Sequence, residues 1–248
     1  MGIDYNKRPK KADPAPDAAP VSTAKTSDAP ISTTKSSSSA PVSTAKAGPV
    51  NLTKRGETVN LSKSSSGAPV RLNLNWTQRP AGGGGGGFMK RLAGGGGNID
   101  LDLGCLWELS TGDKGVVQAL GGAFGDLDGP PFIKLDKDDR SGASTDGENL
   151  LVSGEHSQYI TRLAVFAFIY EGVKKWSQAG AVVTIHSGDG PVTINLDETR
   201  DGVGMCAICI IESTPSGFAI ERQVQYISGH RELDELFGWG LNWRAGRK

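Results

Sequence analysis

The sequence is poor in cysteine, in aromatic side chains and in long apolar runs. Its 248 residues include three Cys, and aromatic residues make up 6% of the chain. Three Cys in a chain of this length do not make a disulfide scaffold. No run approaches the roughly 20 apolar residues that a membrane-spanning helix needs, and the basic first eight residues are not followed by the apolar stretch of a secretory signal. The sequence therefore predicts a cytoplasmic protein without direct membrane insertion.

Charge is distributed unevenly along a chain whose formal net charge is zero. Residues 1–48 contain seven Lys or Arg and four Asp or Glu, whereas residues 49–248 contain 20 basic and 23 acidic residues. The stretch from Asp100 to His156 contains 12 acidic and four basic residues. A nucleic-acid-binding surface requires a basic stripe, and this local excess of negative charge argues against one. We therefore expect no nucleic-acid partner and favour a bound cation.

The first 48 residues consist mainly of Ala, Pro, Ser, Thr and Lys. A short repeat, Ala-Pro-Val/Ile-Ser-Thr-Ala/Thr-Lys, begins at Ala19, Ala29 and Ala40. Without Trp or Phe, this segment cannot bury enough apolar surface to offset the entropy of the chain, so we predict a disordered tail over residues 1–48. Residues 82–97 are rich in Gly and predict a flexible insertion. The remainder of residues 49–248 predicts one domain of ordinary size.

Short segments of strand-forming residues separated by turn signals follow the tail. Most of them show the alternation of apolar and polar residues that marks a half-buried strand. Residues 160–170 are apolar on both faces, which indicates a central strand. Many short strands at such spacing predict an all-β, two-sheet sandwich with few short helices. The expected strands are 49–54, 58–63, 70–76, 99–109, 115–119, 132–135, 160–170, 181–186, 192–196, 205–212 and 218–226, with a turn within 173–178 and a short helix over 232–237.

Two carboxylates occupy alternate positions in one of these expected strands, the segment Ile99-Asp-Leu-Asp-Leu103. Side chains at positions i and i+2 of a strand face the same way. Asp100 and Asp102 should therefore project from one face while the apolar residues face the core. Two carboxylates at this spacing repel each other unless a cation or a hydrogen-bond donor lies between them.

A second acidic cluster lies between residues 135 and 150, in a segment interpreted as a loop. It contains Gly and Ser, so it can fold around a small centre, and it offers several oxygen ligands without His or Cys. Such a set suits calcium better than zinc or copper. The segment is not an EF-hand, because counting from Asp136 places Ser141 at position 6 and Gly147 at position 12. The candidate metal ligands are Asp100, Asp102, Asp138, Asp139, Asp146 and Glu148, with Asn149 or loop carbonyls completing the shell.

The acidic segment also has a simpler interpretation. It could be a solvated turn whose charge is neutralised by Lys134, Lys137 and Arg140. The residues alone do not distinguish these two interpretations of the segment, a calcium site and a solvated or partner-binding turn.

Other motifs give weaker signals. Cys206 and Cys209 form a Cys-x-x-Cys pair, but they fall in an expected strand, where positions i and i+3 face opposite sides, so we interpret them as ordinary core or surface thiols. The three His residues are scattered, and a nucleophile elbow and a phosphate-binding loop are both absent. Trp239 and Trp243 could form a platform for a ligand, although at their spacing they are expected to cap a core. The sequence thus predicts no enzyme activity.

Several of these segments together resemble the TerD family of tellurium-resistance and stress proteins. They are the two Val-Asn-Leu-Thr/Ser-Lys strands, the Ile-Asp-Leu-Asp-Leu strand, and the Asp-Asp-Arg-Ser-Gly segment followed by Asp-Gly-Glu. Within the family the chain looks most like the TerA branch, to which it is similar over roughly residues 50–248 outside the Gly tract. The residues that carry this likeness are Leu106-Trp-Glu-Leu109, Val117-Gln-Ala-Leu-Gly121, Pro130-Pro-Phe-Ile133, Ile169-Tyr-Glu-Gly172 and Trp239-Gly-Leu-Asn-Trp243.

The resemblance implies a two-sheet β-sandwich that binds calcium through acidic loops. It also implies membership of a bacterial multi-protein system of tellurite resistance and stress response, whose other members, including a membrane-embedded one, would be the partners. In the family's typical loop the second half contains one more acidic residue than Asp146-Gly-Glu-Asn149. This difference favours one calcium ion over two.

Two functions follow from these observations. The first is a non-enzymatic calcium-binding module of the tellurite-resistance system that acts through protein assembly. The second is a metal-independent interaction module that uses its acidic loop to bind a basic partner. An enzyme acting on a metal oxyanion has no nucleophile or cofactor motif to support it.

Overall fold

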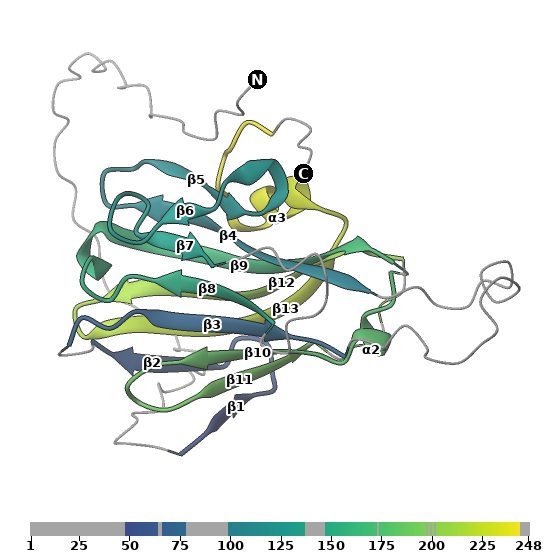
Figure 1. The fold of residues 1–248 in the computed structure, drawn as a ribbon, viewed down its shortest axis with the longest axis horizontal. Helices are drawn as coiled ribbons and strands as arrows, with labels where there is room; N and C mark the ends of the chain where they lie inside the picture. Colours follow the sequence, from purple (N-terminus) through teal and green to yellow (C-terminus); the bar gives the residue numbers. More distant parts are fainter. Residues whose placement is uncertain are drawn as a thin grey trace, which may run out of the picture.

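Two β-sheets packed face to face make up a computed structural model of the chain (Figure 1). The structure describes residues 48–63, 66–77, 99–136, 147–172, 174–196, 198, 200 and 202–243. This architecture confirms the predicted all-β sandwich. The predicted tail, except for Gly48, and the Gly-rich insertion lie outside the described residues. None of the helices in the described ranges is long and apolar enough to cross a membrane.

One sheet has seven strands in the order β1-β11-β10-β3-β8-β7-β6. All neighbouring strands in it are antiparallel except β1 and β11, which are parallel. The bounds of its strands are β1 Val50–Leu52, β3 Val70–Asn75, β6 Gly125–Asp126, β7 Ile133–Leu135, β8 Glu148–Val152, β10 Ala181–His186 and β11 Val192–Leu196.

The other sheet has six antiparallel strands in the order β2-β13-β12-β9-β4-β5. Its strands are longer, and they are β2 Thr58–Ser62, β4 Asp100–Leu109, β5 Lys114–Gln118, β9 Ile160–Glu171, β12 Met205–Thr214 and β13 Gly217–Ile227. In the part of the chain that the structure describes, four short helical segments accompany the sheets: η1 Leu120–Gly122, η2 Ser157–Tyr159, α2 Trp176–Ala179 and α3 His230–Phe237.

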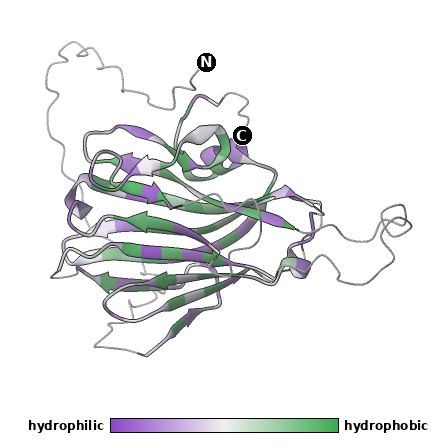
Figure 2. Ribbon diagram, in the orientation of Figure 1, coloured by the Kyte–Doolittle hydropathy of each residue, from purple (hydrophilic) through white to green (hydrophobic). Residues whose placement is uncertain are grey.

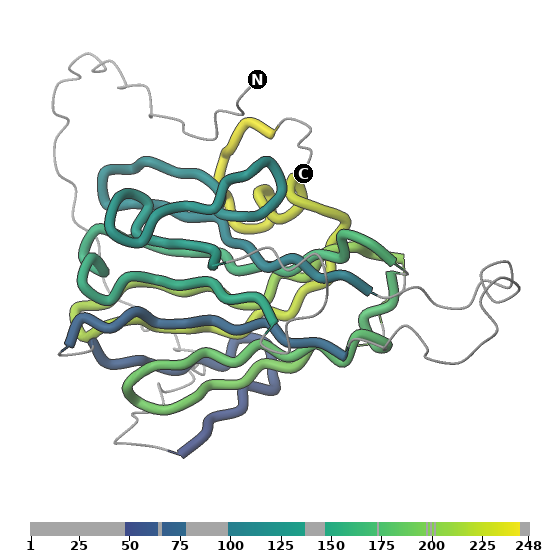
Figure 3. The backbone as a smooth tube through the Cα atoms, in the orientation of Figure 1, coloured from purple at the N-terminus to yellow at the C-terminus, as the bar shows by residue number. Residues whose placement is uncertain are grey.

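The first two predicted strands are both present, but they lie in different sheets. The chain leaves β1 in the seven-stranded sheet, turns through residues 55–57 and enters β2 in the six-stranded sheet (Figure 3). Hydrogen bonds fix this crossing, since Gly56 N donates to Arg222 O over 2.9 Å and Arg222 N donates to Glu57 O over 2.9 Å. The Glu57 carboxylate also accepts from the backbone N–H groups of residues 53 and 54, which lowers its pKa. The turn therefore links the sheets instead of forming a hairpin.

Two strands were not predicted. β6 has only two residues, too few to show an alternation. β8 begins within the segment that was interpreted as a loop and continues past it, and its burial alternates, with Glu148, Leu150 and Val152 buried. The remaining predicted strands and the C-terminal helix are confirmed to within one to two residues at most ends.

The main core lies between the two sheets, and Figure 2 shows hydrophobic residues recurring along the strands that enclose it. The central strand β9 is buried on both faces, as predicted. Leu163, Val165 and Ala167 join the core between the sheets, whereas Phe166 and Phe168 join a second cluster on the outer face of the six-stranded sheet. That outer face therefore needs a cover of its own.

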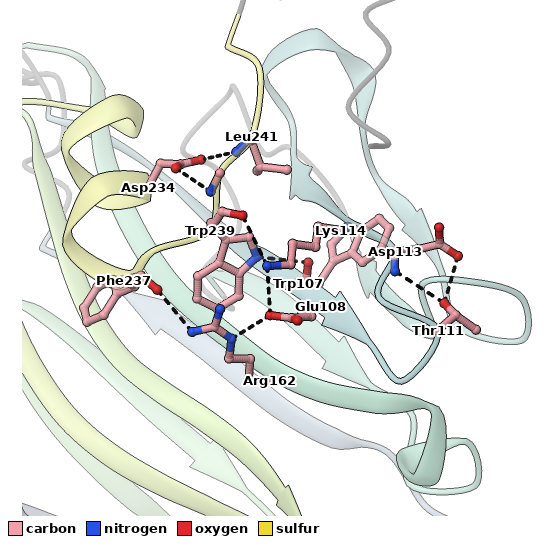
Figure 4. A network of polar contacts seen from close by, with 11 residues as sticks. Trp107, Glu108, Thr111, Asp113, Lys114, Arg162, Asp234, Phe237, Trp239 and Leu241 are labelled. Atoms are coloured by element: carbon pink, nitrogen blue, oxygen red, sulfur yellow. Dashed lines mark hydrogen bonds and ion pairs between the residues drawn. The ribbon is translucent and has the colours of Figure 1, made fainter. Parts of the chain in front are cut away.

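The C-terminal segment provides this cover (Figure 4). Helix α3 ends at Phe237, and Trp239 then packs on the sheet with 2% of its surface exposed while its Nε1 donates to Trp107 O over 3.1 Å. The Asp234 carboxylate accepts hydrogen bonds from Gly240 N, Leu241 N and Trp243 Nε1, at 2.8, 2.8 and 2.9 Å. The expectation that the two terminal Trp residues cap a core is confirmed.

Candidate metal centre

Two buried carboxylate residues from different sheets belong to or contact the same stretch of β4. Asp102 of β4 is 0% exposed and Glu148, the first residue of β8, is 2% exposed. Glu148 Oε2 accepts a hydrogen bond of 2.6 Å from Leu103 N, the nitrogen of the peptide bond that follows Asp102. The strand ladder between β4 and β5 begins only at Gly104, so β5 leaves this part of β4 accessible to Glu148. One predicted ligand from each acidic cluster is therefore buried at this stretch of β4, Asp102 as a residue of the strand and Glu148 through its contact with Leu103 N.

The β4 side of the site follows from simple alternation. Leu101 and Leu103 lie in the core between the sheets, which places Asp102 on the opposite face of the strand. Asp100 is only half-buried, because the pairing of β4 with β9 shifts register between Asp100 and Leu101. Within the predicted pair of acids, Asp102 is therefore the buried member.

The β8 side of the site depends on a glycine. Gly147 has a φ of 66°, and a Cβ added there would lie 2.1 Å from the carbonyl oxygen of Leu74. Only glycine tolerates both the left-handed backbone and this close approach. Gly147 thereby places Glu148 at the start of a strand, with its side chain directed inward. Glu148 belongs to a strand and not to a loop, which corrects the sequence-based interpretation of this position.

The remaining predicted ligands, Asp138, Asp139 and Asp146, lie outside the described residues. The described positions on either side of them are close together, because Asp136 N donates to Asn149 O over 2.8 Å at the end of the β7–β8 ladder. In the described ranges, no group of three or more His, Cys, Asp or Glu side chains is arranged to hold a metal ion. The full six-residue ligand set thus stays a prediction, of which the described part contains Asp100, Asp102 and Glu148.

The Cys-x-x-Cys pair differs from the prediction in one respect. Cys206 and Cys209 both lie in the core between the sheets, instead of on opposite faces of β12. The reason is a β-bulge, since the pairing of β12 with both neighbours skips Ile208. All three Cys are free and buried, and burial raises the pKa of each thiol, to about 12 for Cys209. All three are therefore buried thiols of the core, which agrees with the interpretation of the pair as ordinary core or surface thiols.

Known proteins offer a comparison that is independent of this geometry. No family model matches the sequence. The tellurium resistance protein TerA of Alcaligenes sp is 37% identical over 200 residues, which make up 80% of this chain and 58% of that protein. The chain therefore spans less than two thirds of the length of this relative.

Two solved structures are also similar, each covering 67% of this chain and 94% of the other. The protein SAV2460, described as of unknown function, is 13% identical with a TM-score of 0.48. A homologue of the telluride resistance protein TerD, SCO6318 from Streptomyces coelicolor A3(2), is 16% identical with a TM-score of 0.45. The sequence identity to TerA supports the resemblance of this chain to the TerD/TerA-like tellurium-resistance proteins.

Proposed function

We propose that this chain is a non-enzymatic, calcium-binding component of tellurite resistance that acts through assembly with other tellurite-resistance proteins. The observation that carries the proposal is the hydrogen bond from Leu103 N to Glu148 Oε2, which brings a buried carboxylate of the seven-stranded sheet to the backbone next to buried Asp102 of the six-stranded sheet. The relationship to TerA supports the tellurite-resistance role.

The chemistry of the two groups favours a hard cation. Burying an ionised carboxylate costs free energy unless the charge is paired, hydrogen-bonded or bound to a metal, and this edge holds two such groups. Calcium takes six to eight oxygen ligands at flexible geometry, so it can combine carboxylates from distant strands with loop oxygens. Asp138, Asp139 and Asp146, in the ten residues between Asp136 and Gly147, are the further proposed ligands.

A cation at this position would act on assembly through the fold. Asp102 belongs to the six-stranded sheet and Glu148 to the seven-stranded sheet, so an ion held by both stabilises their packing at this end. Its binding free energy adds to the stability of the folded state. The surface around the 137–146 segment would then differ between the calcium-loaded and calcium-free protein, and partners would recognise the loaded form.

Calorimetric titration of calcium into the full chain tests the proposal, together with melting curves in calcium and in chelator. At 100 times its Kd, a single bound ion adds about 2.7 kcal/mol of stability, which corresponds to a rise in Tm of about 5–10 °C for a domain of this size. Glu148→Gln keeps an acceptor for Leu103 N but removes the charge, so it should fold and lose most of the shift. Asp102→Asn should do the same.

Asp113→Asn is the matched control. Asp113 is an acid in the turn after β4, at the opposite end of that strand from Asp102, and its Oδ2 accepts from Thr111 Oγ1 over 2.8 Å. This variant should keep the full calcium response. Identical melting curves in calcium and chelator would refute the calcium proposal. Capture of a basic partner by calcium-free protein, lost in Glu148→Gln, would instead support the metal-independent module.

A further inference from the structure

A cavity of about 450 Å³ opens at the end of the sandwich opposite to the carboxylate pair. The register of the seven-stranded sheet establishes this position, because Val70 pairs with Val152 at one end of β3 while Leu74 pairs with Glu148 at the other. The connections β2–β3, β10–β11 and β12–β13 surround the cavity, and they lie on the left in Figure 1. A volume of this size suits a small organic molecule.

One hydrogen bond between the two sheets and two at their turns hold the walls of this cavity in place. Ser62 N, at the end of β2, donates to Asp189 Oδ2 in the β10–β11 turn over 2.5 Å. Asp189 N donates to Ser187 Oγ over 3.3 Å, and Lys63 N donates to Ser216 O over 2.6 Å. The Asp189 carboxylate is thus engaged in holding the wall and does not line the cavity.

The charged side chains that line the described cavity are all basic. Lys63 follows β2, and Arg71 and His186 are direct cross-strand partners on β3 and β10. Arg71 Nη1 donates to Asn149 Oδ1 over 3.1 Å, which orients the guanidinium. Burial, and then the positive charge of Arg71, lower the pKa of His186. Three basic groups converge here on a surface without an acidic partner among its lining residues.

The rest of the cavity surface is largely apolar. Pro69 and Val70 at the start of β3, Leu151 of β8 and Phe218 of β13 all contribute to it. The cavity bends around the end of β3, so it touches Val70 on the core side of the strand and Arg71 on the outer side. A ligand that fills it would meet apolar side chains with one part and basic groups with another.

We propose that this cavity binds a small organic anion, with its phosphate, sulfonate or carboxylate group at Lys63, Arg71 and His186 and its apolar body against Val70, Leu151 and Phe218. Charge-assisted hydrogen bonds from Arg and Lys to an oxyanion are the strong polar contacts of such a site. An inorganic oxyanion alone would leave most of the volume and the apolar surface unused.

Calorimetry on the full chain with 1-naphthalenesulfonate tests the proposal, because the charge of this probe does not change between pH 6 and 8. The neutral analogue 1-naphthalenesulfonamide and inorganic sulfate separate the two requirements, and each should bind at least about tenfold more weakly than the sulfonate. 1-Naphthoate and 1-naphthyl phosphate then rank the acid groups. Equal binding of sulfonate and sulfonamide would overturn the proposal.

Substitutions of the basic lining residues test whether the sulfonate binds in this cavity. Arg71→Gln and Lys63→Gln should each weaken sulfonate binding by about tenfold. Lys134→Gln should leave it unchanged, because Lys134 is exposed on β7 of the same sheet but does not line the cavity. An equal loss in all three variants, or in none, would show adventitious binding elsewhere and overturn the assignment.

The pH dependence gives an independent readout. His186 is the cross-strand partner of Arg71 on β3 and lines the same cavity as Lys63, and Asp189, in the turn after β10, is hydrogen-bonded to Ser62 N. A bound anion favours the protonated imidazole, so affinity should increase from pH 8 to pH 6, and this increase should disappear in His186→Gln. An increase that persists in His186→Gln would contradict the proposed role of His186.

Discussion

The guanidinium of Arg162 lies over the indole ring of Trp239, with its central carbon 4.1 Å from the ring centroid (Figure 4). The same side chain donates from Nε to Glu108 Oε2 over 2.7 Å and from Nη1 to Phe237 O over 3.1 Å. Burial alone would raise the pKa of Glu108, but the hydrogen bond and charge of Arg162, with Lys114, lower it. One Arg of β9 thus joins β4 to the C-terminal segment.

Replacing Arg162 should therefore destabilise the cover of the six-stranded sheet. Arg162→Met keeps most of the apolar stem but loses the cation–π contact and both hydrogen bonds, so we expect a loss of roughly 2–3 kcal/mol in the free energy of unfolding. Urea denaturation measures it. Arg231→Met on α3 is the control and should change stability by less than about 0.5 kcal/mol. Equal effects in the two variants would contradict this role for Arg162.

Gly147 allows a test of the geometry that places Glu148. Gly147→Ala should destabilise the protein by more than the roughly 1–2 kcal/mol that a left-handed alanine costs, because its Cβ would overlap Leu74 O. Gly56→Ala is a matched control, since Gly56 has a φ of 80° but nothing within 4 Å of the added Cβ. Gly56→Ala should show the conformational cost alone. Thermal unfolding of the two variants in chelator makes the comparison, and equal losses would mean that the contact with Leu74 is unimportant.

The buried side chain of His230 should make the folded protein less stable in acid. Its ring packs against Phe166, Phe168 and Trp243, its Nε2 lies 2.7 Å from Gln118 Oε1, and burial lowers its pKa to about 4. Between pH 6.5 and 4 the unfolded chain binds a proton that the folded protein excludes, so stability falls as the pH falls, by up to about 3 kcal/mol. Above pH 6.5 the group is neutral in both states and contributes no slope.

The measurement is the difference in unfolding free energy between the wild type and His230→Gln as a function of pH. Subtracting the variant removes the contribution of the carboxylates, which titrate in both proteins. The wild type should lose stability relative to the variant from pH 6.5 to pH 4. Parallel curves would show that His230 accepts a proton in the folded state without cost.

The sequence predicted most of the fold because alternation is a local property. Residues 70–75 and 181–186 alternate between core and solvent, and both segments form strands at the predicted positions. Pairing is a property of the whole chain and was not predictable in the same way. The similar strands β1 and β2 entered different sheets because residues 55–57 are held by β13, which lies more than 150 residues away in sequence.

The candidate site was predictable only in part, for the same reason. Asp102 could be assigned to a face of its strand from its neighbours, and it is indeed buried. The strand at Glu148 was hidden by the acidic residues before it, because Glu148 and Asn149 are both polar and residues 150–152 are all apolar, so its sequence shows no alternation. The cavity at the other end had no signal at all, because Lys63, Arg71 and His186 come together only through the register of β3 and β10 and the docking of β2.

The buried thiols give the last prediction. Cys105, Cys206 and Cys209 are each at most 1% exposed, and burial raises their pKa values, so the reactive thiolate is scarce at neutral pH. A thiol reagent such as 5,5′-dithiobis-(2-nitrobenzoate) at pH 8 should therefore label none of them in the folded protein and all three in urea. The bulge at Ile208 makes Cys206 and Cys209 equivalent in this respect, although the spacing of the pair would otherwise direct one of them outward. Rapid labelling of Cys206 or Cys209 in the absence of urea would contradict this placement of both thiols in the core.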